Sequence, residues 1–266
     1  MKSRMLVISI IAGFVVLSCS PQQIYRDVVD ETADQLAEEI TARVVNAYLG
    51  EIGPRFIQSY TVGLMQVMFY QGGFYGEELD YEPGEYTIWA SDDSPYGERF
   101  ERAFLQRRDD GWEWWRVEIY GEDPDTDEDV HMIMEALFEP RDEQRYIREL
   151  HVQYPHEDQP QEVEITEEDA EQWVLQAEEW DQEEFTQAFV ATEEVTVPAG
   201  TFSADRYRSD AGEQDDVLSE WWITDREVPG SIVKIRQTDE DTGEEFQTMV
   251  LQSYGTDAVE PRLSTF

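Results

Sequence analysis

The feature that most restricts the fold is an alternation of apolar and polar residues at a period of two, which begins near residue 85. Successive side chains of a strand point to opposite faces of a sheet, so this period predicts strands with one buried face. Short connections such as Asp110-Gly111 favour antiparallel pairing, and a phase change at Trp114-Trp115 indicates a bulge. The expected strands are ten, at residues 85–90, 98–108, 112–121, 130–139, 144–154, 194–197, 202–209, 218–224, 231–238 and 245–254.

Three segments have helical spacing instead. Apolar residues three and four positions apart predict an amphipathic helix at 25–49, and glycines separate it from a second helix at 54–70. A capping box at Thr166 opens a third helix, expected to run toward Phe189. The fold class expected from the whole pattern is α+β: an antiparallel open half-barrel of about ten strands, with helices packed in or beside its concave face.

The second helix is unusual because residues 56–70 carry no charge and are apolar almost all round. Such a helix must be covered by protein or ligand, and it is short for a membrane span. Two interpretations stay open, a core helix packed on the sheet and a lid over an apolar cavity. A cavity would be lined by this helix and by one face of strand 130–139, whose other face carries His131 and Glu135. The candidate lining residues are Phe56, Tyr60, Leu64, Met68, Met132, Met134 and Phe138.

Residues 1–18 have the organisation of a secretory signal peptide, with two positive residues before an apolar run. The sequence Val16-Leu17-Ser18-Cys19 resembles the bacterial lipobox, which implies cleavage before Cys19 and lipid attachment to it. Cys19 is the only cysteine, so a disulfide within the chain is excluded. Each buried CH₂ is worth about 0.8 kcal/mol, so two or three acyl chains would anchor the protein stably to a membrane.

The remaining chain is expected to contain a lipid-anchored spacer at 19–24, one β domain at 25–256 and a tail at 257–266. Ser20, in place of Asp, resembles lipoproteins that move to an outer membrane, facing the periplasm or the cell surface. The chain has 61 acidic and 19 basic residues. A body this negative is repelled by phosphates, which excludes nucleic acid as a partner.

The most specific sequence pattern lies between residues 195 and 235. It consists of Val195-Thr-Val-Pro-Ala-Gly-Thr-Phe202, followed by Trp221-Trp-Ile-Thr-Asp-Arg-Glu-Val-Pro-Gly-Ser-Ile-Val-Lys234. This pattern resembles exported β-rich relatives of the periplasmic lipoprotein carrier and receptor superfamily (LolA/LolB-like). The resemblance implies an incomplete barrel around helices, whose apolar interior receives acyl chains in the carriers. Because this chain is itself lipidated, a membrane-fixed receptor or binder is favoured over a shuttle.

Motifs for catalysis are absent from the sequence. It contains no nucleophile elbow, phosphate loop, dinucleotide fingerprint or His-Glu-x-x-His. Three histidines are too few to indicate a metal site, and the alternating acids at 123–129 lack the glycine and glutamate of a calcium loop. No catalytic residue, metal or cofactor is therefore predicted. The expected function is non-catalytic binding of a lipid or acyl chain; the alternative is a structural or protein-interaction lipoprotein with a filled core, and an enzyme ranks third.

The lipid anchor gives a direct prediction. Replacement of Cys19 by Ser removes the thiol that would carry the acyl chains, so the variant should leave the membrane fraction. The measurement is fractionation of cells that are metabolically labelled with a fatty acid. Membrane-bound, labelled Cys19→Ser protein would contradict the prediction.

Overall fold

The computed structural model describes residues 61–62, 65, 69, 81–91, 99–122, 129–141, 144–155, 157, 159–166, 174–176, 182–210, 217–240 and 242–264. These residues form one antiparallel sheet, in the order β6-β5-β4-β3-β2-β1-β12-β11-β10-β9-β8, with β7 also paired to β5. The elements are β1 (Tyr86–Ser91), β2 (Arg99–Arg107), β3 (Glu113–Glu122), β4 (Asp129–Arg141), β5 (Gln144–Gln153), β6 (Gln161–Val163), β7 (Val174–Gln176), α6 (Gln182–Ala188), β8 (Phe189–Val197), β9 (Gly200–Asp210), β10 (Val217–Ile223), β11 (Ile232–Asp239) and β12 (Glu245–Gly255).

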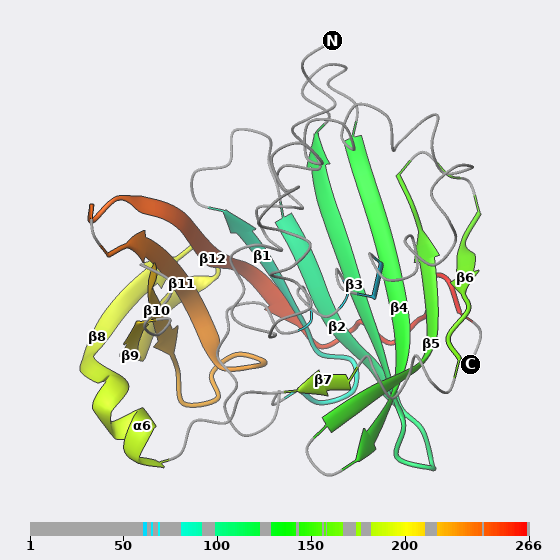
Figure 1. Ribbon diagram of the computed structural model, residues 1–266, viewed down its shortest axis with the longest axis horizontal. Coiled ribbons are helices and arrows are strands. Elements are labelled where there is room, and N and C mark those ends of the chain that lie inside the picture. The colour runs from blue at the N-terminus through cyan, green and yellow to red at the C-terminus, as the bar shows by residue number, and fades with distance from the viewer. Residues whose placement is uncertain are drawn as a thin grey trace.

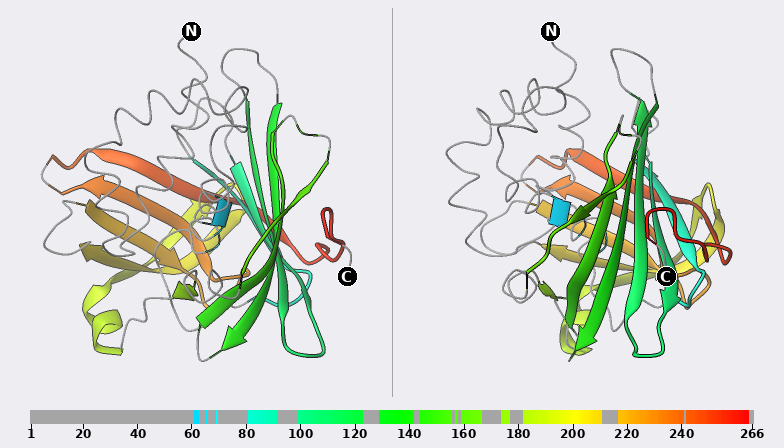
Figure 2. Two further views of the ribbon diagram at one scale, coloured as in Figure 1. Left: turned by 45° about the vertical axis from the view of Figure 1, so that its right-hand side comes forward. Right: turned by 90° about the vertical axis from the view of Figure 1, so that its right-hand side faces the viewer.

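The sheet is open and strongly bent. Strands β2–β5 form one half and β8–β11 the other, and the pair β1–β12 joins them (Figure 1). Figure 2 shows the two halves turned toward each other. Both halves contribute side chains to one apolar core, from Phe104 and Trp115 on one side to Trp221 and Ile235 on the other. The bend therefore gives the sheet a concave face that is buried between its own halves.

The expected α+β class is wrong, because the described chain is almost entirely antiparallel sheet. Its helical residues are those of α6 and four residues of the second predicted helix. The third predicted helix is wrong at Val174–Gln176, which form β7 against Gln144–Tyr146, but α6 lies within its expected range. Ladder hydrogen bonds to β5 outweigh the helical spacing of this segment. The first predicted helix, at 25–49, lies outside the described residues. Of the second, four residues are described, and they are helical.

The ten predicted strands correspond to β1–β5 and β8–β12, and their pairing is antiparallel as expected. The predicted turn at Asp110-Gly111 is confirmed: the backbone N–H of Gly111 donates to the carbonyl of Arg108 at 3.0 Å. Two strands were missed, β6 and β7. Each has three residues, which is too short to show an alternation.

The central strands carry apolar groups on both faces. Trp115 of β3 points into the concave core, whereas Trp114 points to the convex face and packs in a second cluster with Leu105 and Leu137. The bulge predicted in β3 is wrong for this reason: both tryptophans are buried, on opposite faces. β3 keeps a continuous register with β4, and the extra residue is Leu105 of β2.

The turn before β11 presses closely on the core. Gly230 has a φ of +70°, and a Cβ at this position would lie 2.7 Å from Cε2 of buried Tyr81. Gly111 also has a positive φ, of +90°, but a Cβ there would meet nothing within 4 Å. The two glycines thus share a backbone conformation that is strained for residues with a Cβ, and they differ in packing.

This pair allows backbone strain and packing to be separated. Gly111→Ala should lower the free energy of unfolding by about 1 kcal/mol, the cost of a left-handed conformation. Gly230→Ala should lower it by about 2 to 4 kcal/mol, because overpacking against Tyr81 is added. Urea denaturation of both variants checks this expectation. Equal losses would show that Tyr81 yields without cost.

Candidate functional site

The concave face holds the part of the predicted site that the structure describes. Met132, Met134 and Phe138 point inward from β4 and are buried in the main core. The other predicted lining residues, Phe56, Tyr60, Leu64 and Met68, and the predicted lipidation site Cys19 lie outside the described residues. The expectation that alternate residues of β4 share one buried face is confirmed.

Described residues of the second predicted helix pack on this same face. Val62, Met65 and Phe69 are buried in the main core. The Phe69 ring lies 4.8 Å from that of Trp115 and 4.9 Å from that of Phe138, measured between centroids. These contacts are direct packing of the segment against the strands.

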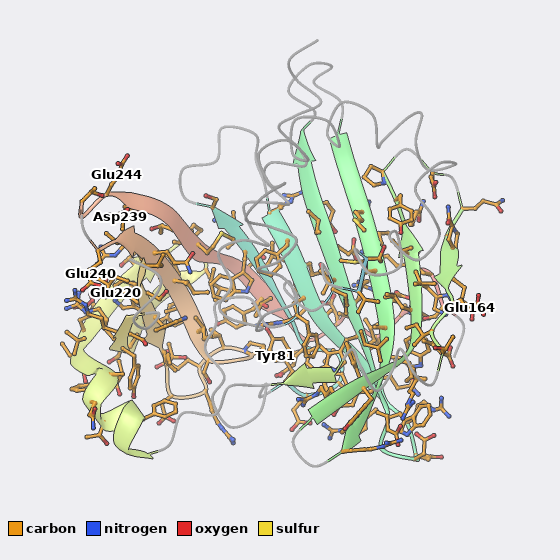
Figure 3. All side chains as sticks on the ribbon, viewed as in Figure 1. Tyr81, Glu164, Glu220, Asp239, Glu240 and Glu244 are labelled. Carbon is orange, nitrogen blue, oxygen red and sulfur yellow. The ribbon has the colours of Figure 1, made fainter. Side chains whose placement is uncertain are left out.

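A charged side chain lies within the concave core. Arg102 of β2 is 3% exposed. Its Nε and Nη2 donate hydrogen bonds to the hydroxyl of Tyr81 at 3.1 and 3.0 Å, and its Nη1 donates to the backbone carbonyl of Phe69 at 2.6 Å. Figure 3 shows Tyr81 between the two halves of the sheet.

The polar contacts continue from Tyr81. Its hydroxyl lies 2.6 Å from Oγ1 of buried Thr87, and Nε1 of Trp89 donates to the same Oγ1 at 3.1 Å. Together, Tyr81, Thr87, Trp89 and Arg102 form a cluster that we call the core polar site. The site can donate hydrogen bonds to an anion, since it contains a guanidinium and hydroxyl groups.

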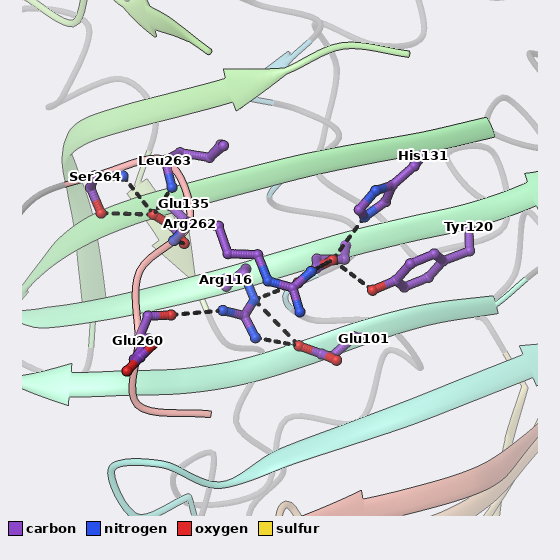
Figure 4. A network of polar contacts seen from close by, with 10 residues as sticks. Glu101, Arg116, Tyr120, His131, Glu135, Glu260, Arg262, Leu263 and Ser264 are labelled. Carbon is purple, nitrogen blue, oxygen red and sulfur yellow. Dashed lines mark hydrogen bonds and ion pairs between the residues drawn. The ribbon is translucent and has the colours of Figure 1, made fainter. Parts of the chain in front are cut away.

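The convex face carries a second polar network, centred on Glu118 (Figure 4). Its Oε2 accepts a hydrogen bond from the Tyr120 hydroxyl at 2.6 Å and lies 2.8 Å from Nε2 of His131 and 2.5 Å from Nη1 of Arg262. Its Oε1 lies 2.6 Å from Nε of Arg116. A fully buried carboxylate is therefore surrounded by donors.

These surroundings decide the ionisation of Glu118. Burial alone would raise its pKa, but hydrogen bonds from His131 and Tyr120 and the charges of Arg116 and Arg262 hold the pKa below its ordinary value. Burial and the hydrogen bond to Glu118 raise the pKa of the Tyr120 hydroxyl. The Glu118 carboxylate therefore stays ionised and the Tyr120 phenol stays protonated at neutral pH.

The C-terminal segment closes the convex face. Backbone N–H groups of Arg262, Leu263 and Ser264 donate to the buried Glu135 carboxylate at 2.7, 3.0 and 2.8 Å, and the Ser264 hydroxyl donates at 2.7 Å. Residues 257–264, within the expected tail, are thus fixed against the sheet. The convex network binds the chain's own C-terminal segment, which explains its paired charges without a ligand.

Sequence reasoning missed both polar sites. The charged positions of β3 and β4 alternate with apolar ones, which is typical of a solvent-facing side, and nothing in the sequence indicates that the C-terminal segment covers them. A signal did exist for the core polar site. Arg102 lies between Phe100 and Phe104 on one face of the same strand, so a charge interrupts an apolar face.

Comparisons with known proteins add little. No family model matches the chain, and no curated protein matches it. Among solved structures, one described as a "putative lipoprotein from Parabacteroides distasonis" is 11% identical, with a TM-score of 0.28 over 65% of this chain and 96% of that chain. A match at this TM-score establishes neither fold nor function here, and the LolA/LolB-like resemblance stays a prediction.

Among the described residues, no helix is long and apolar enough to cross a membrane. Within the same part of the chain, no group of three or more His, Cys, Asp or Glu is placed to hold a metal ion.

The lowered pKa of Glu118 predicts how stability depends on pH. Ionised Glu118 stabilises the fold above its unfolded pKa, ordinarily 4.5, and this contribution is lost as the pH falls through the lower folded pKa. Glu118→Gln should therefore cost about 3 kcal/mol at pH 7, and less at pH 3. Urea denaturation at both pH values measures the difference.

Glu194→Gln, on exposed edge strand β8, is the matched control. It should change the free energy of unfolding by less than about 0.5 kcal/mol at either pH. A loss in Glu118→Gln that is the same at pH 7 and pH 3 would mean that the Glu118 carboxyl carries no linked proton.

Proposed function

We propose that this protein is a lipid-anchored component of the bacterial envelope that binds an apolar ligand, a lipid or an acyl chain, on the concave face of its sheet. The anchor would be Cys19, and the outer membrane is the proposed location. The role is binding without catalysis. The LolA/LolB-like resemblance of residues 195–235 supports the same proposal from the sequence.

One observation carries the binding proposal: the methionines gather on the concave face. All four methionines among the described residues, Met65, Met132, Met134 and Met249, are buried in the main core, together with aromatic rings from both halves of the sheet. Methionine is unbranched and polarizable, and protein surfaces that accept varied apolar partners use it for that reason. A face made in this way is suited to an acyl chain.

The open sheet is compatible with ligand entry. Within the described residues, no strand ladder joins β8 at one edge to β5, β6 or β7 at the other. The two halves are therefore connected through β1 and β12 and are not closed into a ring. Separation of the halves would break side-chain contacts and leave the hydrogen bonds of the ladder intact.

A second candidate function follows from another observation. Phe69 packs directly on Trp115 and Phe138, as expected where chain atoms fill the space between the halves. A filled core would make the protein a structural or protein-interaction lipoprotein. The two candidates differ in what the core does when an acyl chain is offered.

The test is uptake of a fluorescent fatty acid by the Cys19→Ser protein, which lacks its own acyl chains. The parent should bind the probe, and unlabelled fatty acid should displace it. Met134→Asp should abolish uptake while a cooperative thermal transition remains, because water can reach a charge in a binding cavity. Met134→Leu, which keeps apolar volume, should still take up the probe.

The opposite result is equally specific. A parent that takes up no probe, together with a Met134→Asp protein that simply unfolds, would replace the binding proposal by the filled-core one.

A further inference from the structure

The core polar site contains the positive charge of Arg102, which no other charge of the described core neutralises. The partners of the Arg102 guanidinium are the hydroxyl of Tyr81 and the carbonyl of Phe69, both uncharged, and its Cζ lies 5.1 Å from the Tyr81 ring centroid. Burial of an ion costs free energy unless it is paired. Among the described residues, no carboxylate lies within ion-pair distance of this guanidinium.

Scarcity of acids does not explain this arrangement, because the chain has 61 acidic residues. Other buried or half-buried arginines are paired with them. Arg116 contacts Glu101 at 2.7 Å, and Arg145 contacts Glu113 at 3.2 Å. Arg102 is thus the exception among the buried arginines that the structure describes.

The guanidinium also has donor capacity left. An arginine carries five N–H groups in a planar fork. Three hydrogen bonds are formed by Arg102, two to the Tyr81 hydroxyl and one to the Phe69 carbonyl. Two N–H groups therefore have no acceptor among the described residues. A planar carboxylate with two oxygens matches such a fork better than any single neutral oxygen does.

The surroundings resemble a head group site at the end of an apolar wall. The Tyr81 ring packs on Trp115 at 5.3 Å between centroids, and Phe69 packs on the same indole. The turn at Gly230 lies close on the other side, where a Cβ would be 3.4 Å from Nη2 of Arg102. The guanidinium thus lies between aromatic side chains and the backbone of this turn.

We propose that Arg102 binds the carboxylate of a long-chain fatty acid, with the acyl chain lying along the Met and aromatic side chains of the concave face. This inference rests on the proposed function and specifies its ligand class. The energetic reason is pairing: a bound carboxylate supplies the counter-ion that Arg102 lacks among the described residues.

The experiment compares three probes of equal chain length on the Cys19→Ser protein: palmitate, hexadecanol and hexadecylamine, each in competition with a fluorescent fatty acid. Palmitate should bind at least about tenfold more tightly than hexadecanol, since a hydrogen-bonded charge contributes more than one factor of ten. Hexadecylamine should bind most weakly, because its ammonium group meets the guanidinium.

Two variants test the residue itself. Arg102→Met keeps an unbranched apolar stem and removes the charged guanidinium, so palmitate and hexadecanol should then bind equally, within about twofold. Arg107→Met removes the same charge from an exposed position of the same strand and should leave the preference for palmitate unchanged.

Each outcome has one meaning. A parent that binds palmitate and hexadecanol equally overturns the inference and leaves the proposed function standing. A parent that binds none of the three probes overturns the proposed function and this inference with it. If Arg102→Met does not fold, the ranking of the three probes by the parent decides: acid over alcohol over amine supports the inference, and any other order rejects it.

Discussion

The structure depends on burial of one face of a sheet that, among the described residues, is covered by no second sheet. Fully burying a Leu, Phe or Met side chain is worth about 1.5 to 3 kcal/mol, and such residues line the concave face of nearly every strand. The described chain meets this constraint by bending, so that both halves of the sheet contribute side chains to one core, to which Phe69 and Tyr81 also belong. This shared core couples the two halves.

The strands were predictable because their constraint is local. A strand with one buried face must alternate, and the alternation is visible in segments such as those that form β4 and β12. The failure at Val174–Gln176 has the opposite origin. Those residues have helical spacing in the sequence, but a distant strand supplies the hydrogen bonds that fix them as β7. Nothing in the sequence of this segment indicates that β5 is its partner.

The candidate site shows the same difference between residues fixed by local periodicity and residues fixed by distant contacts. Sequence periodicity correctly placed Met132, Met134 and Phe138 on one buried face, because a period within a single strand decides that. It gave no account of Glu118 and Glu135, whose burial depends on the C-terminal segment crossing the convex face. Arg102 was an intermediate case, since its position in the strand indicated burial and its partners could not be known.

The pairing of β1 with β12 has a consequence for the order of folding. The first strand in the described part of the chain, β1, has the last strand, β12, as one neighbour, and the C-terminal segment covers the convex face. Contacts so distant in sequence form slowly, because a long loop must close first. A chain exported from its N-terminus would hold β1 without this neighbour until translocation ends. Chain order would thus keep the protein incompletely folded during its passage, and the sheet would be completed on the same side of the membrane as the proposed lipid anchor.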